Sequence, residues 1–407
     1  MRRIYIFIAA MLFLTSCEKN LTENRPSLKL YGDALEDIGY SISRTGNGYY
    51  IGGQFTEVIR NKAKYIETDS SVKRMAVIKT DKNGNHIWKK SFGENTAVGT
   101  KVLALQDGSV ISTGYILNDA NQKDIYVVKV SENGMSFSER IYAEPGNQAG
   151  IDILQTTEGF IILGSTDQAR EGTADSIGNI SGKSDIYLLR IDTNLEPLGT
   201  VANGWPGNDQ AVAIKDDIKG GYVITGTTDN SWPNQDFNNI FILKTNLFGE
   251  PTMIRILGTT DYEYASDLEV LDDGYLIAGI AGREGTDQWI YLTKIPEDIF
   301  SQPVYTNKFR VSSTSSTASS FAVRAISRYG TDSFVLAGQA GTGSSAKMLI
   351  FVADAEGKQV TGKEMITSAT GIQVAYDVIS DETDEIIAVG KNSFENNSMI
   401  SFFKIRF

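Results

Sequence analysis

The sequence has one cysteine, Cys17, one histidine, His86, and only 8 prolines in 407 residues. A single cysteine excludes a disulfide framework and a metal site built on several thiolates. A single histidine excludes sites that need two imidazoles, and His86 itself is expected at the surface. Basic residues are also in the minority, because 38 Lys and Arg stand against 50 Asp and Glu, a formal net charge of −12. This acidity argues against nucleic acid as a partner, since phosphate binding needs a basic surface.

Glycine and aromatic residues are abundant by contrast. The chain contains 39 Gly, 18 Tyr and 18 Phe, which favours many short β-strands with tight turns over helices. Its length would allow two or three average domains, but all-β chains of this size often form one domain. Composition therefore predicts an all-β protein.

The first twenty residues, MRRIYIFIAAMLFLTSCEKN, combine a basic start with an apolar run from Ile4 to Leu14. Such a run is too short to span a bilayer and fits the hydrophobic region of a signal peptide. The ending LTSC resembles the lipobox of bacterial lipoproteins, in which the cysteine is acylated and becomes the first residue of the mature chain. We therefore expect a signal peptide at 1–16 and, over 17–26, the lipidated Cys17 followed by a polar tether of nine residues, Glu18 to Pro26. An ordinary signal peptide with a chance cysteine is the alternative.

A motif that ends in glycine recurs along the rest of the chain, as in GGYVITG (220–226) and GYLIAG (274–279). Its seven copies have a mean spacing of about 56 residues and end at Gly53, Gly114, Gly164, Gly226, Gly279, Gly338 and Gly390. Three further runs rich in β-branched and aromatic residues accompany each copy, which makes four short strands per unit. Units of this kind and period predict a β-propeller of seven four-stranded antiparallel blades.

The two ends of the chain complete each other. The seventh unit stops at Phe407 after its third strand, and a fitting fourth strand, SLKLYG (27–32), precedes the first unit. We expect this N-terminal strand to close the ring and leave no open sheet edge. A solenoid would need atypical capping repeats at both ends, and none is visible. Residues 27–407 are therefore predicted to form a single propeller domain.

The pattern GGYVITGTTDN (220–230) followed by NNIFILKTNLFGEP (238–251) resembles the propeller repeats of lipid-anchored proteins from Bacteroidetes-type bacteria. The resemblance covers almost all of the mature chain and implies the fold and a lipid-anchored place at the outer membrane, on either its periplasmic or its outer side. KTDKNGNHIW (79–88) resembles quinoprotein-type repeats, a class that also serves as a scaffold for outer-membrane protein assembly. The other units lack its tryptophan, and no cysteine pair is present, so no cofactor is expected.

Asp152, Asp267 and Asp377 each precede an apolar residue in the first, innermost strand of a unit. Carboxylates at one repeat position would approach the central channel or the junctions between blades, where they need partners. Hydrogen bonds to neighbouring backbone amides would satisfy them, and a ligand or cation in the channel is the alternative. The turn DKNGN (81–85) is interpreted as a hairpin turn rather than a calcium loop, so no metal site is predicted.

Aromatic residues in two loops of the fourth unit are the remaining candidates for binding. Trp205 enters that unit and Trp232 follows its second strand, so both are expected on the same face of the propeller. With Asn234 and Asp236 beside them, exposed indole rings would suit stacking on sugar rings or a protein contact. The alternative is that each ring packs over the edges of its blade.

Three functions are compatible with these observations. The first hypothesis is a non-catalytic outer-membrane lipoprotein that binds a protein partner or a glycan through one propeller face. The second is an enzyme acting on polysaccharide, a glycosidase or lyase, that uses carboxylates at the channel mouth. The third is a scaffold for outer-membrane protein assembly. Membrane contact is expected through the lipid in every case, because the acidic protein surface would be repelled by anionic lipids.

Overall fold

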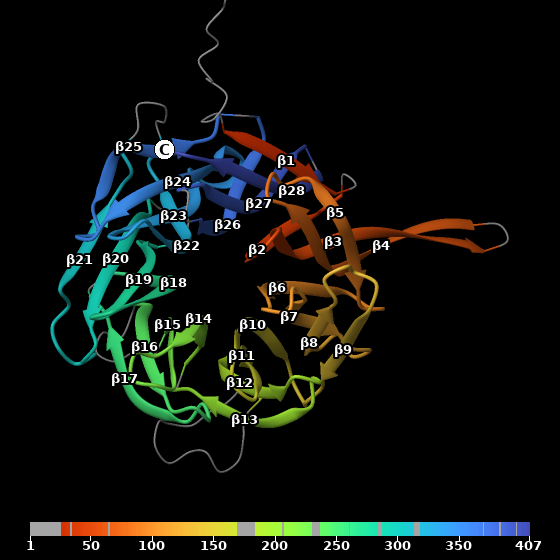
Figure 1. Ribbon diagram of the computed structural model, residues 1–407, viewed down its shortest axis with the longest axis horizontal. Helices are drawn as coiled ribbons and strands as arrows, with labels where there is room; N and C mark the ends of the chain where they lie inside the picture. The colour runs from red at the N-terminus through yellow and green to blue at the C-terminus, as the bar shows by residue number, and fades with distance from the viewer. Residues whose placement is uncertain are drawn as a thin grey trace, which may run out of the picture.

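Seven four-stranded antiparallel sheets form a closed ring in the computed structural model of the chain (Figure 1). This arrangement confirms the predicted seven-bladed all-β propeller. The only helix among the described residues is the short 3-10 turn η1 (Gly343–Ser345). The structure describes residues 26–407 except 33–34, 64–65, 169–183, 206, 230–236, 260, 284–286, 313–317, 369, 382–383 and 396.

The first four blades follow one another along the chain. Blade 1 holds β2 (Ile38–Thr45), β3 (Gly48–Ala63), β4 (Ile66–Asp81) and β5 (His86–Phe92). Blade 2 holds β6 (Ala97–Ala104), β7 (Val110–Leu117), β8 (Lys123–Val130) and β9 (Phe137–Tyr142). Blade 3 holds β10 (Gln148–Gln155), β11 (Gly159–Thr166), β12 (Asp185–Asp192) and β13 (Pro197–Asn203). Blade 4 holds β14 (Asp209–Asp216), β15 (Tyr222–Thr228), β16 (Asn239–Thr245) and β17 (Pro251–Leu257).

The last three blades complete the ring. Blade 5 holds β18 (Glu263–Leu271), β19 (Gly274–Ala281), β20 (Trp289–Pro296) and β21 (Tyr305–Phe309). Blade 6 holds β22 (Phe321–Tyr329), β23 (Ser333–Ala340), β24 (Lys347–Asp354) and β25 (Gln359–Ile366). Blade 7 holds β26 (Ile372–Ser380), β27 (Ile386–Phe394), β28 (Asn397–Ile405) and, as its outer strand, β1 (Ser27–Tyr31).

Strand β1 closes the ring as the sequence predicted. It pairs antiparallel with β28, from Ser27 opposite Lys404 to Tyr31 opposite Ile400. The Tyr31 hydroxyl also donates a hydrogen bond to the Gly84 carbonyl oxygen of blade 1 at 2.6 Å. The first and last strands of the ring are therefore held together by main-chain hydrogen bonds, and β28 has no open edge.

The antiparallel strands define two faces of the ring. We call the face where the inner strands begin the upper face and the face where they end the lower face. Turns between first and second strands, and between third and fourth strands, lie on the lower face. Turns between second and third strands, and the connections between blades, lie on the upper face.

The repeated glycines lie opposite a bulge in each inner strand. Gly226 pairs with Ala211, and the register then shifts so that Ala213 is the next partner. A side chain at Gly226 would place its Cβ 2.3 Å from the Gln210 carbonyl oxygen. The same register shift occurs in all seven inner strands and leaves one extra residue in each: Tyr40, Thr100, Ile151, Val212, Ser266, Arg324 and Tyr376. The glycine is thus required by the bulge and not by a ligand.

The hydrophobic core lies between the blades. Seven clusters of buried apolar side chains occur among the described residues, and each combines two adjacent blades. One of them joins blades 7 and 1 through Ile387, Val389 and Phe402 against Ile42 and Ile51. Every blade therefore buries apolar side chains on both of its faces, one set against each neighbouring blade.

Candidate functional site

The inner strands enclose a central space, which we call the channel. At the channel, the residue directly after each bulge provides the contact between neighbouring inner strands. Asp152, Asp267 and Asp377 hold this position in blades 3, 5 and 7. Small residues hold it in the blades that follow them, namely Ala213, Ala325 and Ser41. The small side chains leave room for a carboxylate to reach the next blade.

Each of the three aspartates hydrogen-bonds two backbone amides. Asp152 accepts the amide of its own neighbour Ile153 at 2.8 Å and the amide of Ile214 in blade 4 at 3.1 Å. Both Asp152 and Asp377 are only 6 % exposed, so these bonds replace water almost completely.

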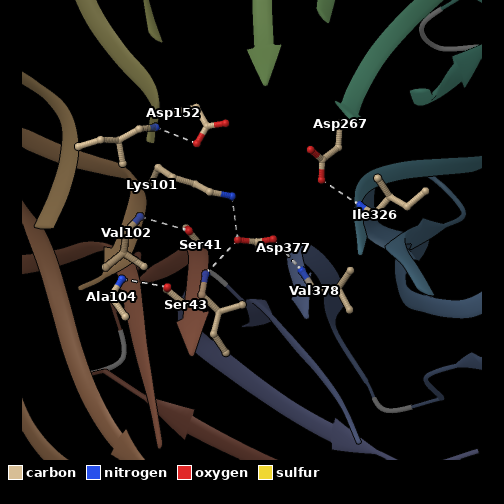
Figure 2. Close-up of polar contacts among 12 residues, drawn as sticks. Ser41, Ser43, Lys101, Val102, Ala104, Asp152, Asp267, Ile326, Asp377 and Val378 are labelled. Carbon is tan, nitrogen blue, oxygen red and sulfur yellow. Dashed lines mark hydrogen bonds and ion pairs between the residues drawn. The ribbon is translucent and has the colours of Figure 1, made fainter. Parts of the chain in front are cut away.

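The other two aspartates repeat this pattern at their own junctions. Asp267 accepts the amides of Leu268 at 2.8 Å and Ile326 at 3.0 Å, and thereby joins blades 5 and 6. Asp377 accepts the amides of Val378 at 2.9 Å and Ile42 at 3.0 Å, and thereby joins blades 7 and 1 (Figure 2). The predicted amide bonds are therefore present at all three positions, while a ligand at these carboxylates stays a prediction.

Because seven is odd, one blade cannot belong to such a pair, and blade 2 carries Lys101 instead. The Lys101 Nζ lies 3.3 Å from the Asp377 Oδ2. The two blades are not neighbours, and Lys101 points into the space that Asp152 and Asp267 also face (Figure 2). Burial lowers the pKa of Lys101, but the charges of Asp377, Asp152 and Asp267 outweigh this and raise the pKa above its usual range. Lys101 is thus a built-in counter-ion for the three carboxylates.

Blade 2 is joined to blade 1 by hydroxyl groups instead of a carboxylate. The Ser41 Oγ accepts the Val102 amide at 3.2 Å, and the Ser43 Oγ accepts the Ala104 amide at 2.9 Å (Figure 2). Blade 1 thus has a serine where blades 3, 5 and 7 have an aspartate. The amide of Ile42, next to Ser41, is the one that donates to the Asp377 carboxylate. Four junctions between adjacent blades are therefore joined by the side-chain oxygens of these residues, which accept backbone amides: blades 7 and 1, 1 and 2, 3 and 4, and 5 and 6.

A second pair of charged residues lies nearer the lower end of the channel. Lys215 and Glu269 each stand two residues after the position of the aspartates, in blades 4 and 5. Burial raises the pKa of Glu269 to about 7, and Lys215 opposes this only in part. Burial lowers the pKa of Lys215, and Asp267 and Glu269 raise it above its usual value. The channel therefore holds fixed charges of both signs.

The upper mouth of the channel carries aromatic rings and an arginine from the bulge positions. The rings of Tyr40 and Tyr376 meet edge to face at 5.1 Å across the junction of blades 7 and 1. The Arg324 guanidinium of blade 6 lies 5.1 Å from the centre of the Tyr376 ring. Its Nη2 also donates to the Gln339 Oε1 at 3.2 Å, which fixes the orientation of the guanidinium.

Arg324 lines a cleft of about 450 Å³ between blades 5 and 6, on the upper face. The cleft lies between the ends of strands and two upper connections, and its walls are formed by Tyr264, Ile280, Gln288, Ala322, Gln339, Thr342 and Gly343 with Arg324. A volume of this size fits one or two sugar rings or a short peptide. The lining offers a cation, two side-chain amides and a phenol ring within one concave surface.

The aromatic candidates of blade 4 do not form the predicted exposed pair as far as the structure describes them. Trp205 is 8 % exposed, and its ring packs 5.4 Å from the ring of Phe241. The expectation of an exposed indole is therefore wrong for Trp205, and the packing alternative holds because the ring fills the junction of blades 3 and 4. Trp232, Asn234 and Asp236 lie outside the described residues, so their binding role stays a prediction.

A pair of buried acids lies at the upper end of the same junction. Asp185 is 1 % exposed and Asp209 is fully buried. Neither oxygen of Asp185 accepts a hydrogen bond from a described residue, while the Asp209 Oδ2 accepts the Trp205 amide at 2.5 Å. Burial, and then the charge of Asp209, raise the pKa of Asp185 to about 7.

The turn DKNGN has the structure of a hairpin turn. The Asp81 Oδ1 accepts the amides of Asn83 at 2.8 Å and Asn85 at 2.7 Å, and Gly84 has a φ of +73°. The carboxylate is therefore engaged by the turn itself. His86 follows the turn and is exposed. Over the described ranges, no three His, Cys, Asp or Glu side chains gather into a set that could hold a metal ion.

No protein-family profile and no curated protein matches this chain. Solved propellers do match its fold. An ulvan lyase, a polysaccharide lyase bound to a saccharide of GlcA and Rha3S, has a TM-score of 0.53 at 8% identity over 91% of this chain and 95% of its own. The periplasmic gluconolactonase of Pseudomonas aeruginosa has 0.51 at 9% identity over 83% of this chain and 87% of its own. Saccharomyces cerevisiae Sqt1 has 0.50 at 7% identity over 91% of this chain and 97% of its own.

These proteins are similar to the chain in fold alone, and their identities are too low to carry an activity. The chain is thus a seven-bladed β-propeller. In the part of the chain that the structure describes, no helix has the length and hydropathy of a membrane span.

Reasoning from the sequence missed Arg324, Tyr40 and Tyr376 at the upper mouth. A signal for them exists, because each bulge residue precedes the glycine that ends its motif by 13 or 14 residues. Arg324, for example, precedes Gly338 by 14 residues. Counting back from each glycine would have identified the residues that face the mouth, but only once the bulge was known.

Proposed function

We propose that this chain is a lipid-anchored binding protein of the outer membrane that holds an acidic glycan at the upper mouth of its propeller. Attachment would occur through the acylated Cys17 and the tether before Ser27. The observation that supports the proposal is the cleft between blades 5 and 6, in which Arg324 is held by Gln339 and stands beside the ring of Tyr376.

The chemistry of this lining favours a sugar that carries a carboxylate. Side-chain amides such as Gln288 and Gln339 both donate and accept hydrogen bonds, which suits vicinal hydroxyls. Tyr264 adds an aromatic surface for the apolar face of a sugar ring. Arg324 offers a fork of donors to a carboxylate in a protein whose formal net charge is −12. A neutral glycan would offer no negative charge to this guanidinium.

The three channel aspartates do not support the enzymatic alternative. A general acid or nucleophile needs an oxygen free to reach the substrate. Both oxygens of Asp267 accept backbone amides, and the same holds for Asp152 and Asp377. We therefore propose binding without turnover at this face.

Retention on immobilised polygalacturonate, with neutral dextran as the reference, tests the proposal. Arg324→Gln should reduce retention on the uronate polymer by at least tenfold and leave the melting temperature unchanged. Arg328→Gln is the matched control, because Arg328 lies on the same strand at the lower end, where its Nη2 donates to the Val270 carbonyl oxygen. Equal losses in both variants, or no retention of the parent protein by any acidic glycan, would show the proposal to be wrong. Incorporation of labelled palmitate, abolished by Cys17→Ala, tests the anchor separately.

A further inference from the structure

In the described part of the chain, the most exposed large apolar side chains lie on the lower face. Among the described residues, the five large apolar side chains with the greatest exposure are Met135 (83%), Leu247 (62%), Phe300 (61%), Val304 (60%) and Phe248 (56%). We call them the lower apolar set. All five lie in turns between a third and a fourth strand, in blades 2, 4 and 5. Such turns lie on one face of the ring by topology, so these side chains project from the same side.

Part of this set surrounds a groove. Leu247 and Phe248 form the apolar wall of a cavity of about 530 Å³ between blades 3 and 4, whose other walls carry polar and charged side chains such as Glu158 and Asp216. Phe248 is also covered on one side by the Arg190 guanidinium, 4.9 Å from its ring centre. The neighbouring turn of blade 5 adds Phe300, and the Lys219–Glu297 ion pair at 2.5 Å links the lower turns of blades 4 and 5. The lower turns of blades 4 and 5, which carry four of the five side chains of the lower apolar set, are therefore neighbours.

The chain enters the propeller on the same face. Ser27, the first residue of β1, pairs with Lys404, which lies one residue before the lower end of β28. The 26 residues that precede Ser27 include Cys17. Nine residues of tether reach at most about 30 Å when extended. A lipid on Cys17 would therefore hold the lower face close to the membrane and would bring the lower apolar set within reach of it.

We propose that the lower face rests on the lipid bilayer, with the lower apolar set inserted among the headgroups, so that the cleft at Arg324 opens away from the membrane. This inference rests on the proposed anchoring at Cys17. A bilayer is favoured as the occupant because protruding side chains in turns of blades 2, 4 and 5 can enter a flat, soft surface together. A peptide in the groove would cover blades 3 and 4 and leave Met135, Phe300 and Val304 in water.

The charged residues of the lower turns predict which lipids the lower face prefers. The same turns contain exposed carboxylates, among them Glu132, Glu250 and Asp298. These would be repelled by anionic lipids, while the apolar side chains gain from any bilayer. The lower face should therefore prefer zwitterionic lipid, and added salt should weaken that preference because it screens the repulsion.

The position of each face can be measured with a single fluorophore. Because Cys17 is the only cysteine and acylation consumes its thiol, Met135→Cys or Ser344→Cys introduces the only free thiol in the lipidated chain. Ser344 is exposed in η1 on the upper face. In phosphatidylcholine vesicles that contain a nitroxide-labelled lipid, a dye at position 135 should be quenched at least threefold more than a dye at position 344. Equal quenching at the two positions, or stronger quenching at 344, would overturn the proposal.

A matched pair of variants tests the apolar contact itself. Leu247→Ser combined with Phe248→Ser should at least halve the quenching at position 135, whereas Phe394→Ser, at an exposed ring of the upper face, should leave it unchanged. Cross-linking of position 135 to a protein without lipid quenching would assign the face to a protein partner and contradict the proposal.

Failure of the anchor is distinguishable from failure of the orientation. If the chain incorporates no palmitate, the proposed anchoring is wrong. The two dye positions are then compared in a chain in which a histidine tag replaces residues 1–17, Cys17 included, and holds the protein on nickel-chelating vesicles. Quenching at 135 above 344 would still support the lower face as the lipid-binding face, and equal quenching would overturn it.

Discussion

The Asp377 carboxylate of blade 7 lies 3.3 Å from the Lys101 ammonium of blade 2, with blade 1 between their blades in the ring. Replacing Lys101 by methionine should lower the free energy of unfolding by about 1–3 kcal/mol, because the buried Asp377 carboxylate would lose its ion-pair partner. Urea denaturation measures this change. Lys101→Arg should keep most of the stability, and a Lys101→Met variant as stable as the parent would contradict the role of Lys101 as a counter-ion.

Asp267 allows the bridge between two blades to be tested without changing the core. Asp267→Ala removes the acceptors for the Leu268 and Ile326 amides and should cost about 1–3 kcal/mol of stability. Asp267→Asn keeps one acceptor oxygen and should cost less. Hydrogen exchange at the Ile326 amide should accelerate in the alanine variant before global unfolding does. Asp273→Asn, at an exposed carboxylate on the lower face, is the control and should change stability by less than about 0.5 kcal/mol.

Removal of strand β1 should lower the melting temperature much more than the substitution of an exposed side chain on this strand. Deleting Ser27–Tyr31 exposes the edge of β28 and removes the hydrogen bond from the Tyr31 hydroxyl to Gly84. We expect the melting temperature to fall by more than about 5 °C and the protein to aggregate more readily. Leu28→Ser, at a side chain that is 43% exposed, should shift the melting temperature far less. An unchanged melt after the deletion would argue against ring closure by this strand.

Asp185 should make the stability depend on pH in an unusual direction. Its pKa is raised to about 7 in the folded state, from an ordinary value of 3.8. Between these values the folded protein holds a proton that the unfolded chain has lost. The free energy of unfolding should therefore fall as the pH rises, by up to about 1.4 kcal/mol per unit and about 4 kcal/mol in total. Above pH 7 this contribution is flat.

Urea denaturation at pH 5 and pH 8 measures this slope. Asp185→Asn cannot ionise, so the loss of stability between the two pH values should shrink in this variant. Asp119→Asn, at an exposed side chain, serves as the control and should keep the parent slope. A parent slope in the Asp185 variant would mean that another group controls the effect.

The blade count and the closing strand were readable from the sequence because a backbone requirement repeats seven times. Each motif glycine faces a bulge whose carbonyl oxygen leaves no room for a Cβ, as at Gly390, where a Cβ would lie 1.8 Å from the Val374 oxygen. Such a constraint allows one residue type and so marks the chain at every repeat. The direction of the Asp152, Asp267 and Asp377 side chains toward backbone amides was also foreseen as one of two alternatives.

The residues at the upper mouth of the channel could not be predicted from the repeats in this way. Arg324, Tyr40 and Tyr376 occupy bulge positions that accept many side chains, since Thr100, Val212 and Ser266 stand at equivalent places. No repeated residue type marks them. For Trp205 the sequence left two interpretations open, an exposed ring or a ring packed over the blade edge, and the structure shows packing against Phe241. Whether such a ring is exposed or buried depends on the packing between blades, which brings together residues that are far apart in the sequence.

The pairing of Ser27 with Lys404 also determines when the ring of blades can close. Strand β1 is synthesised before every other strand of the ring, and its partner β28 is synthesised after them. Contacts at such sequence separation form late, because the intervening chain must first be ordered. The last blade therefore keeps an unpaired edge until β28 has been made and meets β1, and an unpaired strand edge is a site of aggregation while the chain folds.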